Sequence, residues 1–341
     1  MSAHGDAYPV DLKPLHTFGL QAWAQGLHTI SGLADLSAYA DSVRQGQPVL
    51  LLGEGSNTVF VQENNALNVW KMALMGKQYL GCDGTHHHLR VMAGENWHSL
   101  VEWTVQQGWG GLENLALIPG SVGAGPVQNI GAYGVELKDR IRAVQVFDVQ
   151  TQTSQTLGLP ACEFAYRESV FKQAGKGRWV ITAVDFALPV EWTPVLHYGD
   201  LSRRVADLGA VTALNVMKAV CAIRTDKLPD PVVLGNSGSF FKNPLVSVAQ
   251  FESIKAAHPA LVHFPADGGL VKLAAGWLIE QCGLKGAIHH AVGVYDRQAL
   301  ILVNHGAGQG AHLLDLIRRI QQAVQTRFGV HLEAEPNLIA G

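Results

Sequence analysis

The sequence has little of several features that mark particular classes of protein. Charged residues make up only 16% of the 341 residues and the formal net charge is −3, whereas nucleic-acid-binding proteins usually carry a basic face. No apolar run reaches the roughly 20 residues that a membrane-spanning helix needs. The first residues also lack the basic start and apolar stretch of a secretory signal. We therefore expect a cytoplasmic protein that binds neither nucleic acid nor a membrane.

Cysteine is also scarce, and its spacing gives no sign of a metal site. None of the four cysteines forms a Cys-x-x-Cys pair, which argues against a zinc ribbon and a dithiol redox site. The histidine tracts His86-His-His88 and His289-His290 have no further ligand at a suitable spacing, so we interpret both as polar loops. We expect no metal, and reduced thiols at Cys82, Cys162, Cys221 and Cys282.

Apolar residues are plentiful, at 48% of the chain, and their spacing alternates between the periods of strands and helices. The predicted strands are 48–52, 143–149, 180–186, 291–295 and 299–303. The predicted helices are one from Trp97 to Gly108, one capped by Asp267 and closed by Gly283, and one from Leu313 to Gly329. The pattern indicates an α+β fold with two or three domains.

Glycine is concentrated in loops. Gly53-Glu-Gly-Ser-Asn57 follows a predicted strand, and 119–125 and 131–134 lie in a stretch with almost no charge. Glycine allows a backbone to approach a phosphate closely, and its turned N–H groups can form an anion-binding nest. The loops match neither the Rossmann nor the Walker pattern. From the residues alone, a dinucleotide cradle and ordinary turns are equally good interpretations.

Three further polar positions stand out. Gly235-Asn-Ser-Gly-Ser239 has serine where the serine-hydrolase elbow requires glycine, so Ser239 is either a turn residue or a proton donor. Arg167 is either a surface residue or a bidentate partner for a carboxylate. Glu333 and Glu335 alternate with apolar residues and would share one face of a strand, either at a solvated edge or at a site.

The longest motifs resemble the UDP-N-acetylenolpyruvoylglucosamine reductase family. The similar segments are 118–134, 235–244 and 275–279, in the expected order, and the similarity extends from about Leu15 to Glu335. The segment 196–201 looks like the tyrosine-bearing loop of the type I branch. One departure is His16, where the family usually has asparagine.

The resemblance implies an α+β fold of the vanillyl-alcohol-oxidase (PCMH) type, with two FAD-binding subdomains and an α+β substrate-binding domain. The first subdomain would cover residues 1–68, joined by 329–341. The second would cover 69–228 and the substrate domain 229–328. The predicted FAD contacts, which include the glycine loops, are Gly53, Glu54, Gly55, Ser56, Asn57, Pro119, Gly120, Ser121, Val122, Gly123, Gly125, Gly131, Ala132 and Tyr133.

The resemblance also implies a reaction with two halves. NADPH would reduce FAD, and the flavin would then pass the hydride to the enolpyruvyl double bond of a UDP-sugar, giving UDP-N-acetylmuramate for peptidoglycan synthesis. Arg167 and a protonated Glu335 would stabilise the enolate-like charge, and Ser239 would protonate the carbon. The predicted substrate contacts are Tyr198, Lys227, Asn243 and Gln298.

Two alternatives share part of this pattern. A sugar or hydroxy-acid oxidase of the same flavin fold would have the glycine loops without the Arg167, Ser239 and Glu335 set. A catalytically silent flavin- or nucleotide-binding protein would need none of the three. The preference for NADPH over NADH comes from the resemblance alone, because the sequence has no Rossmann acid that would read the ribose. We expect a monomer, although the sequence carries no signal for oligomeric state.

Overall fold

A computed structural model describes residues 9–266 and 268–340. The chain forms two compact units. The first unit comprises the described residues of Met1–Ala24, Gly55–Asn65 and Lys227–Gly341, and the second comprises Gln25–Glu54 and Ala66–Asp226. Each unit has a hydrophobic core of its own. The predicted division into three domains, with boundaries near residues 68, 228 and 328, stays a prediction.

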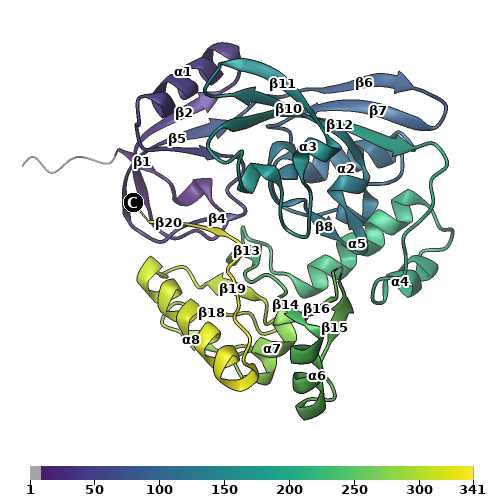
Figure 1. The fold of residues 1–341 in the computed structure, drawn as a ribbon. Coiled ribbons are helices and arrows are strands. Elements are labelled where there is room, and N and C mark those ends of the chain that lie inside the picture. Colours follow the sequence, from purple (N-terminus) through teal and green to yellow (C-terminus); the bar gives the residue numbers. More distant parts are fainter. Residues whose placement is uncertain (1–8, 267, 341) are drawn as a thin grey trace, which may run out of the picture. The chain divides into compact units, whose positions relative to one another are not determined.

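The second unit is built on a five-stranded antiparallel sheet (Figure 1). Its strands, in spatial order, are β11 (Thr153–Gly158), β10 (Ile141–Asp148), β12 (Trp179–Pro189), β7 (His86–Met92) and β6 (Lys77–Cys82). The strands predicted at 143–149 and 180–186 are confirmed as β10 and β12, which pair with each other. Alternate side chains of these strands, Val144, Val146 and Val184 among them, lie in the core.

A second sheet and two helices contribute further residues to the core of the second unit. The sheet has the order β1 (Val10–Asp11), β2 (Trp23–Ile30), β5 (Asn64–Met72), β3 (Val49–Leu52). Strand β1 and the residues that pair with it, Trp23 and Ala24, belong to the first unit. Helix α1 (Leu33–Arg44) buries Leu36, Tyr39 and Ala40. Helix α2 (Trp97–Gln106) confirms the helix predicted after Trp97, and its N-cap Asn96 accepts a hydrogen bond from the Ser99 amide.

The glycine-rich stretch after α2 contains only short elements. They are the 3-10 turns at Glu113–Leu115, Val122–Ala124, Pro126–Gln128 and Leu137–Asp139, and the small hairpin of β8 (Gly131–Ala132) and β9 (Val135–Glu136). Further along the unit lie α3 (Leu159–Cys162), the 3-10 turn Val170–Lys172, α4 (Leu201–Asp207) and α5 (Ala213–Lys227). Little regular structure covers 113–137, so turns and side-chain hydrogen bonds must fix its backbone.

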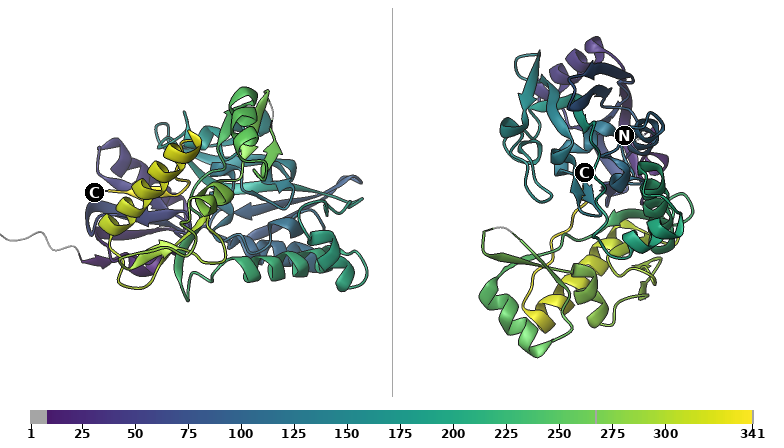
Figure 2. Two further views of the ribbon diagram at one scale, coloured as in Figure 1. Left: turned by 90° about the horizontal axis from the view of Figure 1, so that it is seen from below. Right: turned by 90° about the vertical axis from the view of Figure 1, so that its right-hand side faces the viewer.

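The first unit contains a four-stranded sheet and a long amphipathic helix (Figures 1 and 2). The sheet has the order β13 (Gly235–Ser239), β19 (Ile301–Asn304), β18 (Val292–Val294), β17 (Ile288–His289). Helix α8 (Gly310–Phe328) packs its apolar face into the core and ends at Gly329 with φ +64°. These elements confirm the strands predicted at 291–295 and 299–303 and the helix predicted from Leu313 to Gly329.

The remaining elements of this unit form smaller groups. A three-stranded sheet has the order β14 (Leu245–Ser247), β16 (Leu270–Leu273), β15 (His263–Pro265), with helices α6 (Val248–Ala257) and α7 (Ala275–Gln281). Strands β4 (Thr58–Phe60) and β20 (Asn337–Ile339) pair in parallel, and a 3-10 turn covers Lys13–Leu15. The fold as a whole is α+β, as predicted.

The helix predicted between residues 267 and 283 is wrong in its first half. Leu270–Leu273 forms β16, hydrogen-bonded to β14 and β15 on its two edges, and a helix begins only at Ala275. Gly268 and Gly269 both have positive φ, which interrupts a helix, and the flanking strands satisfy the backbone groups instead. Asp267, the predicted cap, lies outside the described residues. Within 9–266 and 268–340, no helix is long and apolar enough to cross a membrane.

Candidate active site

Two of the predicted flavin loops meet within the second unit. The Glu54 carboxylate accepts hydrogen bonds from the Gly120 amide at 3.2 Å and from Asn96 Nδ2 at 2.7 Å. A Cβ added to Gly53 would lie 2.7 Å from Ser121 Oγ, and one added to Gly123 would lie 2.5 Å from the Ala93 Cβ. Glycine is therefore required at Gly123, where a side chain would meet the Ala93 backbone, whereas a side chain at Gly53 would first displace the Ser121 hydroxyl.

The continuation of the first loop is held inside the first unit. The Thr17 amide donates to the Gly55 carbonyl at 3.2 Å, and Gly55 has φ +68°. A Cβ on Gly55 would lie 2.0 Å from the Leu15 carbonyl oxygen. Asn57 faces the C-terminal segment, where its carbonyl accepts from the Asn337 amide at 2.9 Å. These hydrogen bonds fix the backbone of this loop.

Arg167 reaches the third glycine segment. Its Nη2 donates to the Gly131 carbonyl at 3.0 Å, and a Cβ on Gly131 would lie 3.5 Å from its Nη1. The backbone of Arg167 has φ +57°, a left-handed conformation that is uncommon for a residue other than glycine. Such conformations concentrate at functional sites, where the surrounding structure holds them.

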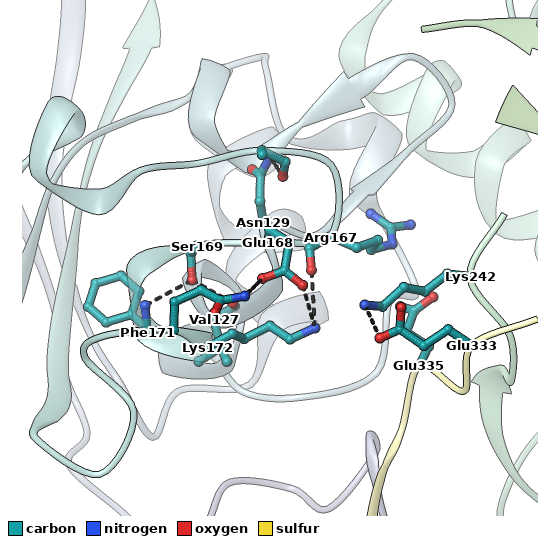
Figure 3. A network of polar contacts seen from close by, with 12 residues as sticks. Val127, Asn129, Arg167, Glu168, Ser169, Phe171, Lys172, Lys242, Glu333 and Glu335 are labelled. Atoms are coloured by element: carbon teal, nitrogen blue, oxygen red, sulfur yellow. Dashed lines mark hydrogen bonds and ion pairs between the residues drawn. The ribbon is translucent and has the colours of Figure 1, made fainter. Parts of the chain in front are cut away.

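A network of hydrogen bonds surrounds the backbone of Arg167 (Figure 3). Lys172 Nζ donates to the Arg167 carbonyl at 3.1 Å and forms an ion pair with Glu168 at 3.6 Å. Ser169 Oγ donates to the Val127 carbonyl at 2.5 Å. These contacts tie the Arg167 turn to the 3-10 turn at Pro126–Gln128, so the guanidinium is presented from a fixed base.

Ser239 and Glu335 are brought together in the first unit. Beyond β13 the chain runs antiparallel to the C-terminal segment, with the Glu335 amide donating to the Phe240 carbonyl and the Lys242 amide to the Glu333 carbonyl, both at 2.9 Å. Ser239 is exposed and Glu335 is half-buried. Lys242 Nζ forms an ion pair with Glu333 Oε1 at 2.6 Å (Figure 3). The predicted proton donor and the predicted carboxylic acid therefore lie on neighbouring extended segments.

The predicted substrate contacts fall into two groups. In the first unit, Asn243 Oδ1 accepts from the Ala275 amide at 2.9 Å, and a Cβ on Gly276 would lie 2.9 Å from Gln298 Oε1. Both side chains therefore meet the start of α7. In the second unit, Tyr198 is 45% exposed and lies edge-on to Tyr133, with 5.7 Å between ring centroids. Lys227 is exposed at the end of α5 and is the first residue of the third segment of the first unit.

Arg224, which lies one helical turn before Lys227 on α5, was not among the residues predicted from the sequence. Burial lowers the pKa of Arg224, partly opposed by interactions with Tyr133 and Cys221. Its Nε is buried and has no hydrogen-bond partner among the described residues. A desolvated cation beside Tyr133, together with glycine loops that exclude any Cβ, fits an anionic cofactor such as FAD. The only signal in the sequence is the helical spacing of Arg224 and Lys227.

Comparisons with known proteins first identify the class. Residues 28–156 match the family model described as an FAD binding domain, and residues 230–339 match the C-terminal domain of UDP-N-acetylenolpyruvoylglucosamine reductase. A crystal structure of UDP-N-acetylenolpyruvylglucosamine reductase from Thermus caldophilus has the same fold, with a TM-score of 0.69 and 24% identity over 97% of this chain and 98% of that one. The chain is an FAD-dependent oxidoreductase with the predicted flavin-binding fold.

Close relatives then identify the family. The UDP-N-acetylenolpyruvoylglucosamine reductase of Cupriavidus pinatubonensis is 49% identical, over 98% of this chain and 99% of its own. The enzyme of the same name from Azoarcus sp. (strain BH72) is 47% identical, over 96% of this chain and 95% of its own. The chain belongs to the UDP-N-acetylenolpyruvoylglucosamine reductase family.

Proposed function

We propose that this chain uses bound FAD and NADPH to reduce the enolpyruvyl double bond of UDP-N-acetylenolpyruvoylglucosamine, giving UDP-N-acetylmuramate. Similarity to enzymes of this name over nearly the whole chain supports the reaction. One observation of the structure carries the proposal: within the first unit, Asn57 of a predicted FAD loop, Ser239 and Glu335 come together around the C-terminal segment. The reaction belongs to peptidoglycan synthesis, and we place it in the cytoplasm, where it serves cell shape and division.

FAD would be held by the three glycine segments, 53–57, 119–125 and 131–133. FAD, when bound, would carry a hydride from NADPH to the substrate. The backbone amides of the loops would hold its diphosphate, because their glycines leave no side chain between the backbone and a phosphate. Arg224 adds a buried positive charge near Tyr133.

Arg167 and Glu335 would stabilise the negative charge that develops on the substrate. Addition of a hydride to the methylene carbon leaves charge on the neighbouring carbon and its carboxylate. A guanidinium can bind that carboxylate with two parallel hydrogen bonds, and a protonated Glu335 can donate a third. Preorganised donors of this kind lower the barrier because they need no reorientation during the reaction.

Ser239 would supply the proton that completes the reduction. Its hydroxyl is exposed at the end of β13, next to the segment that carries Glu335. A serine hydroxyl is a weak acid, but a carbanion-like carbon is a strong enough base to accept its proton. Tyr198, Lys227, Asn243 and Gln298 would bind the nucleotide sugar.

The absorption spectrum of the pure protein tests the proposal. We expect a flavin spectrum that bleaches on addition of NADPH under anaerobic conditions and recovers when UDP-N-acetylenolpyruvoylglucosamine is added. The product should have gained two hydrogen atoms by mass spectrometry. Turnover with oxygen and a simple alcohol in the absence of NADPH would instead indicate a sugar or hydroxy-acid oxidase, and a yellow protein that does not oxidise NADPH would indicate a silent binding protein.

A further inference from the structure

Two buried side chains, Glu113 and Asn114, hydrogen-bond to the connection between β12 and α4, which covers residues 190–200. Glu113 is 2% exposed, and Asn114 is completely buried. Both lie in the short 3-10 turn Glu113–Leu115 of the second unit. Neither has a role in the proposed chemistry, yet a buried carboxylate and a buried amide are costly unless they make specific hydrogen bonds.

Glu113 fixes the first part of the connection. Its carboxylate accepts from Trp192 Nε1 at 2.8 Å and from the Gly111 amide at 2.5 Å. The ring of Trp192 lies against Gly110, where an added Cβ would come within 2.3 to 2.6 Å of three ring atoms. Trp192 is therefore held by a charge-assisted hydrogen bond on one side and by close packing on the other.

Asn114 fixes the connection three residues further on. Its Nδ2 donates to the Val195 carbonyl at 2.8 Å and to the Tyr133 carbonyl at 2.9 Å, which uses both amide hydrogens. One side chain thus joins the 190–200 connection to the predicted flavin segment 131–134. Oδ1 of Asn114 is buried and has no hydrogen-bond partner among the described residues. The side-chain amide therefore acts through its two N–H donors.

The other end of the connection is held from α5. Arg204 contacts Asp200 at 3.4 Å and Asp226 at 2.8 Å, so Asp200 is linked to the residue before Lys227. These three side chains are more than a third exposed, and ion pairs of this kind are weak. Tyr198 therefore lies on a short span between a firm anchor at Val195 and a weak anchor at Asp200.

We propose that Glu113 and Asn114 are positioning residues that set where Tyr198 meets the nucleotide substrate. They act through Trp192 and Val195, and they contact neither substrate nor cofactor. The substrate-binding role of Tyr198 rests on the proposed function. The anchoring of the connection does not, so the two can be tested separately.

Gly110→Ala tests the anchor with the smallest possible change. The new methyl group must displace Trp192, whereas the control Gly158→Ala, in the same unit, adds a methyl group with its nearest neighbour at 3.9 Å. We expect Gly110→Ala to raise KM for UDP-N-acetylenolpyruvoylglucosamine about tenfold with kcat within about twofold, a pattern typical of lost substrate binding. Amide hydrogen exchange in 192–199 should become faster. The control should change neither.

Trp192→Phe is the second variant, because it keeps an aromatic ring but removes the N–H that Glu113 accepts. Like Gly110→Ala, it should raise KM for the nucleotide and make amide hydrogen exchange in 192–199 faster. Unchanged exchange in 192–199 in both variants would overturn the anchor. Faster exchange with unchanged KM would overturn the link from the anchor to substrate binding. If the wild-type enzyme does not reduce the nucleotide at all, the proposed function fails, and hydrogen exchange in Trp192→Phe still decides whether Glu113 holds the connection through Trp192.

Discussion

His16 shows how one residue can make stability depend on pH. Its side chain is 4% exposed, hydrogen-bonded through Nε2 to the Leu20 carbonyl at 3.0 Å, and edge-on to Phe60. Burial lowers the pKa of His16 below its ordinary value of 6.5, and the Leu20 hydrogen bond opposes this only in part. The folded protein therefore prefers the neutral ring, while the unfolded chain takes up a proton as the pH falls through 6.5.

We expect His16→Asn to remove this pH dependence. The contribution of neutral His16 is fully present above pH 6.5 and is lost as the pH falls from there toward the lower pKa of the folded state. Over that interval the free energy of unfolding of the wild type should fall relative to the variant by up to about 1.4 kcal/mol per pH unit. Urea unfolding between pH 5 and 8 measures the difference. Parallel curves for the two proteins would show that His16 does not titrate differently in the folded and unfolded states.

Ser239→Ala should separate the two halves of the reaction. Loss of a positioned proton donor typically slows a step by about 10²- to 10⁴-fold, so recovery of the flavin absorbance on adding the nucleotide should slow by this order. Bleaching by NADPH should be nearly unchanged. Stopped-flow absorbance measures both steps, and Ser237→Ala serves as a nearby control. A parallel loss of both steps would remove Ser239 from the role of proton donor.

Arg167→Lys should also impair the second half selectively. A lysine keeps the positive charge but cannot form the planar pair of hydrogen bonds to a carboxylate, nor reach the Gly131 carbonyl in the same geometry. We expect the rate of flavin reoxidation by the nucleotide to fall at least about tenfold, because one good hydrogen bond to a charged group is worth about 1.5–3 kcal/mol. A rate close to that of the wild type in the same stopped-flow experiment would contradict the assignment.

At the scale of elements, α8 depends on one apolar face. Ile320 is completely buried there, between Leu316 and Val324, and Gln322 on the same helix is exposed. Ile320→Ala leaves a cavity that the surrounding helix cannot fill, and we expect the free energy of unfolding to fall by about 2–5 kcal/mol. Gln322→Ala should change it by less than about 0.5 kcal/mol. Urea denaturation measures both, and equal effects would mean that α8 is not packed through this face.

The elements also show what sequence patterns can and cannot predict. α8 could be predicted because its six buried residues, from Leu313 to Phe328, recur at helical spacing before a glycine. Leu270 and Leu273 fit the same spacing, but they lie in a strand because β14 and β15 pair with it from both sides. Local spacing does not contain that information. Whether Leu270–Leu273 forms a strand depends on β14 and β15, which lie outside the window in which the helical spacing is read.

The candidate site follows the same division. The segments 119–125 and 131–134 and Ser239 lie in long motifs that resemble one family, and 53–57 and Glu335 lie within the wider resemblance, so the sequence alone suggests them as site residues; their roles stay predictions. Glu113 and Asn114 could not, because their importance lies in contacts with Trp192 and Val195, which are 79 and 81 residues away in the chain. Arg224 was missed for a related reason: an arginine on a helix is ordinary until the structure shows that it is buried and that its Nε has no hydrogen-bond partner among the described residues.

At the scale of the whole molecule, the pairing of β20 with β4 has a consequence for synthesis on the ribosome. All residues of the second unit have been translated by Asp226, whereas the first unit needs Asn337–Ile339 to complete its strand beside Thr58–Phe60. During translation the second unit can form its core early, while the first must wait for Asn337–Ile339. Glu335 reaches its place beside Phe240 only in that last step. A nascent chain that stalls before Glu335 would therefore carry a complete second unit and a first unit in which β20 is not yet paired with β4.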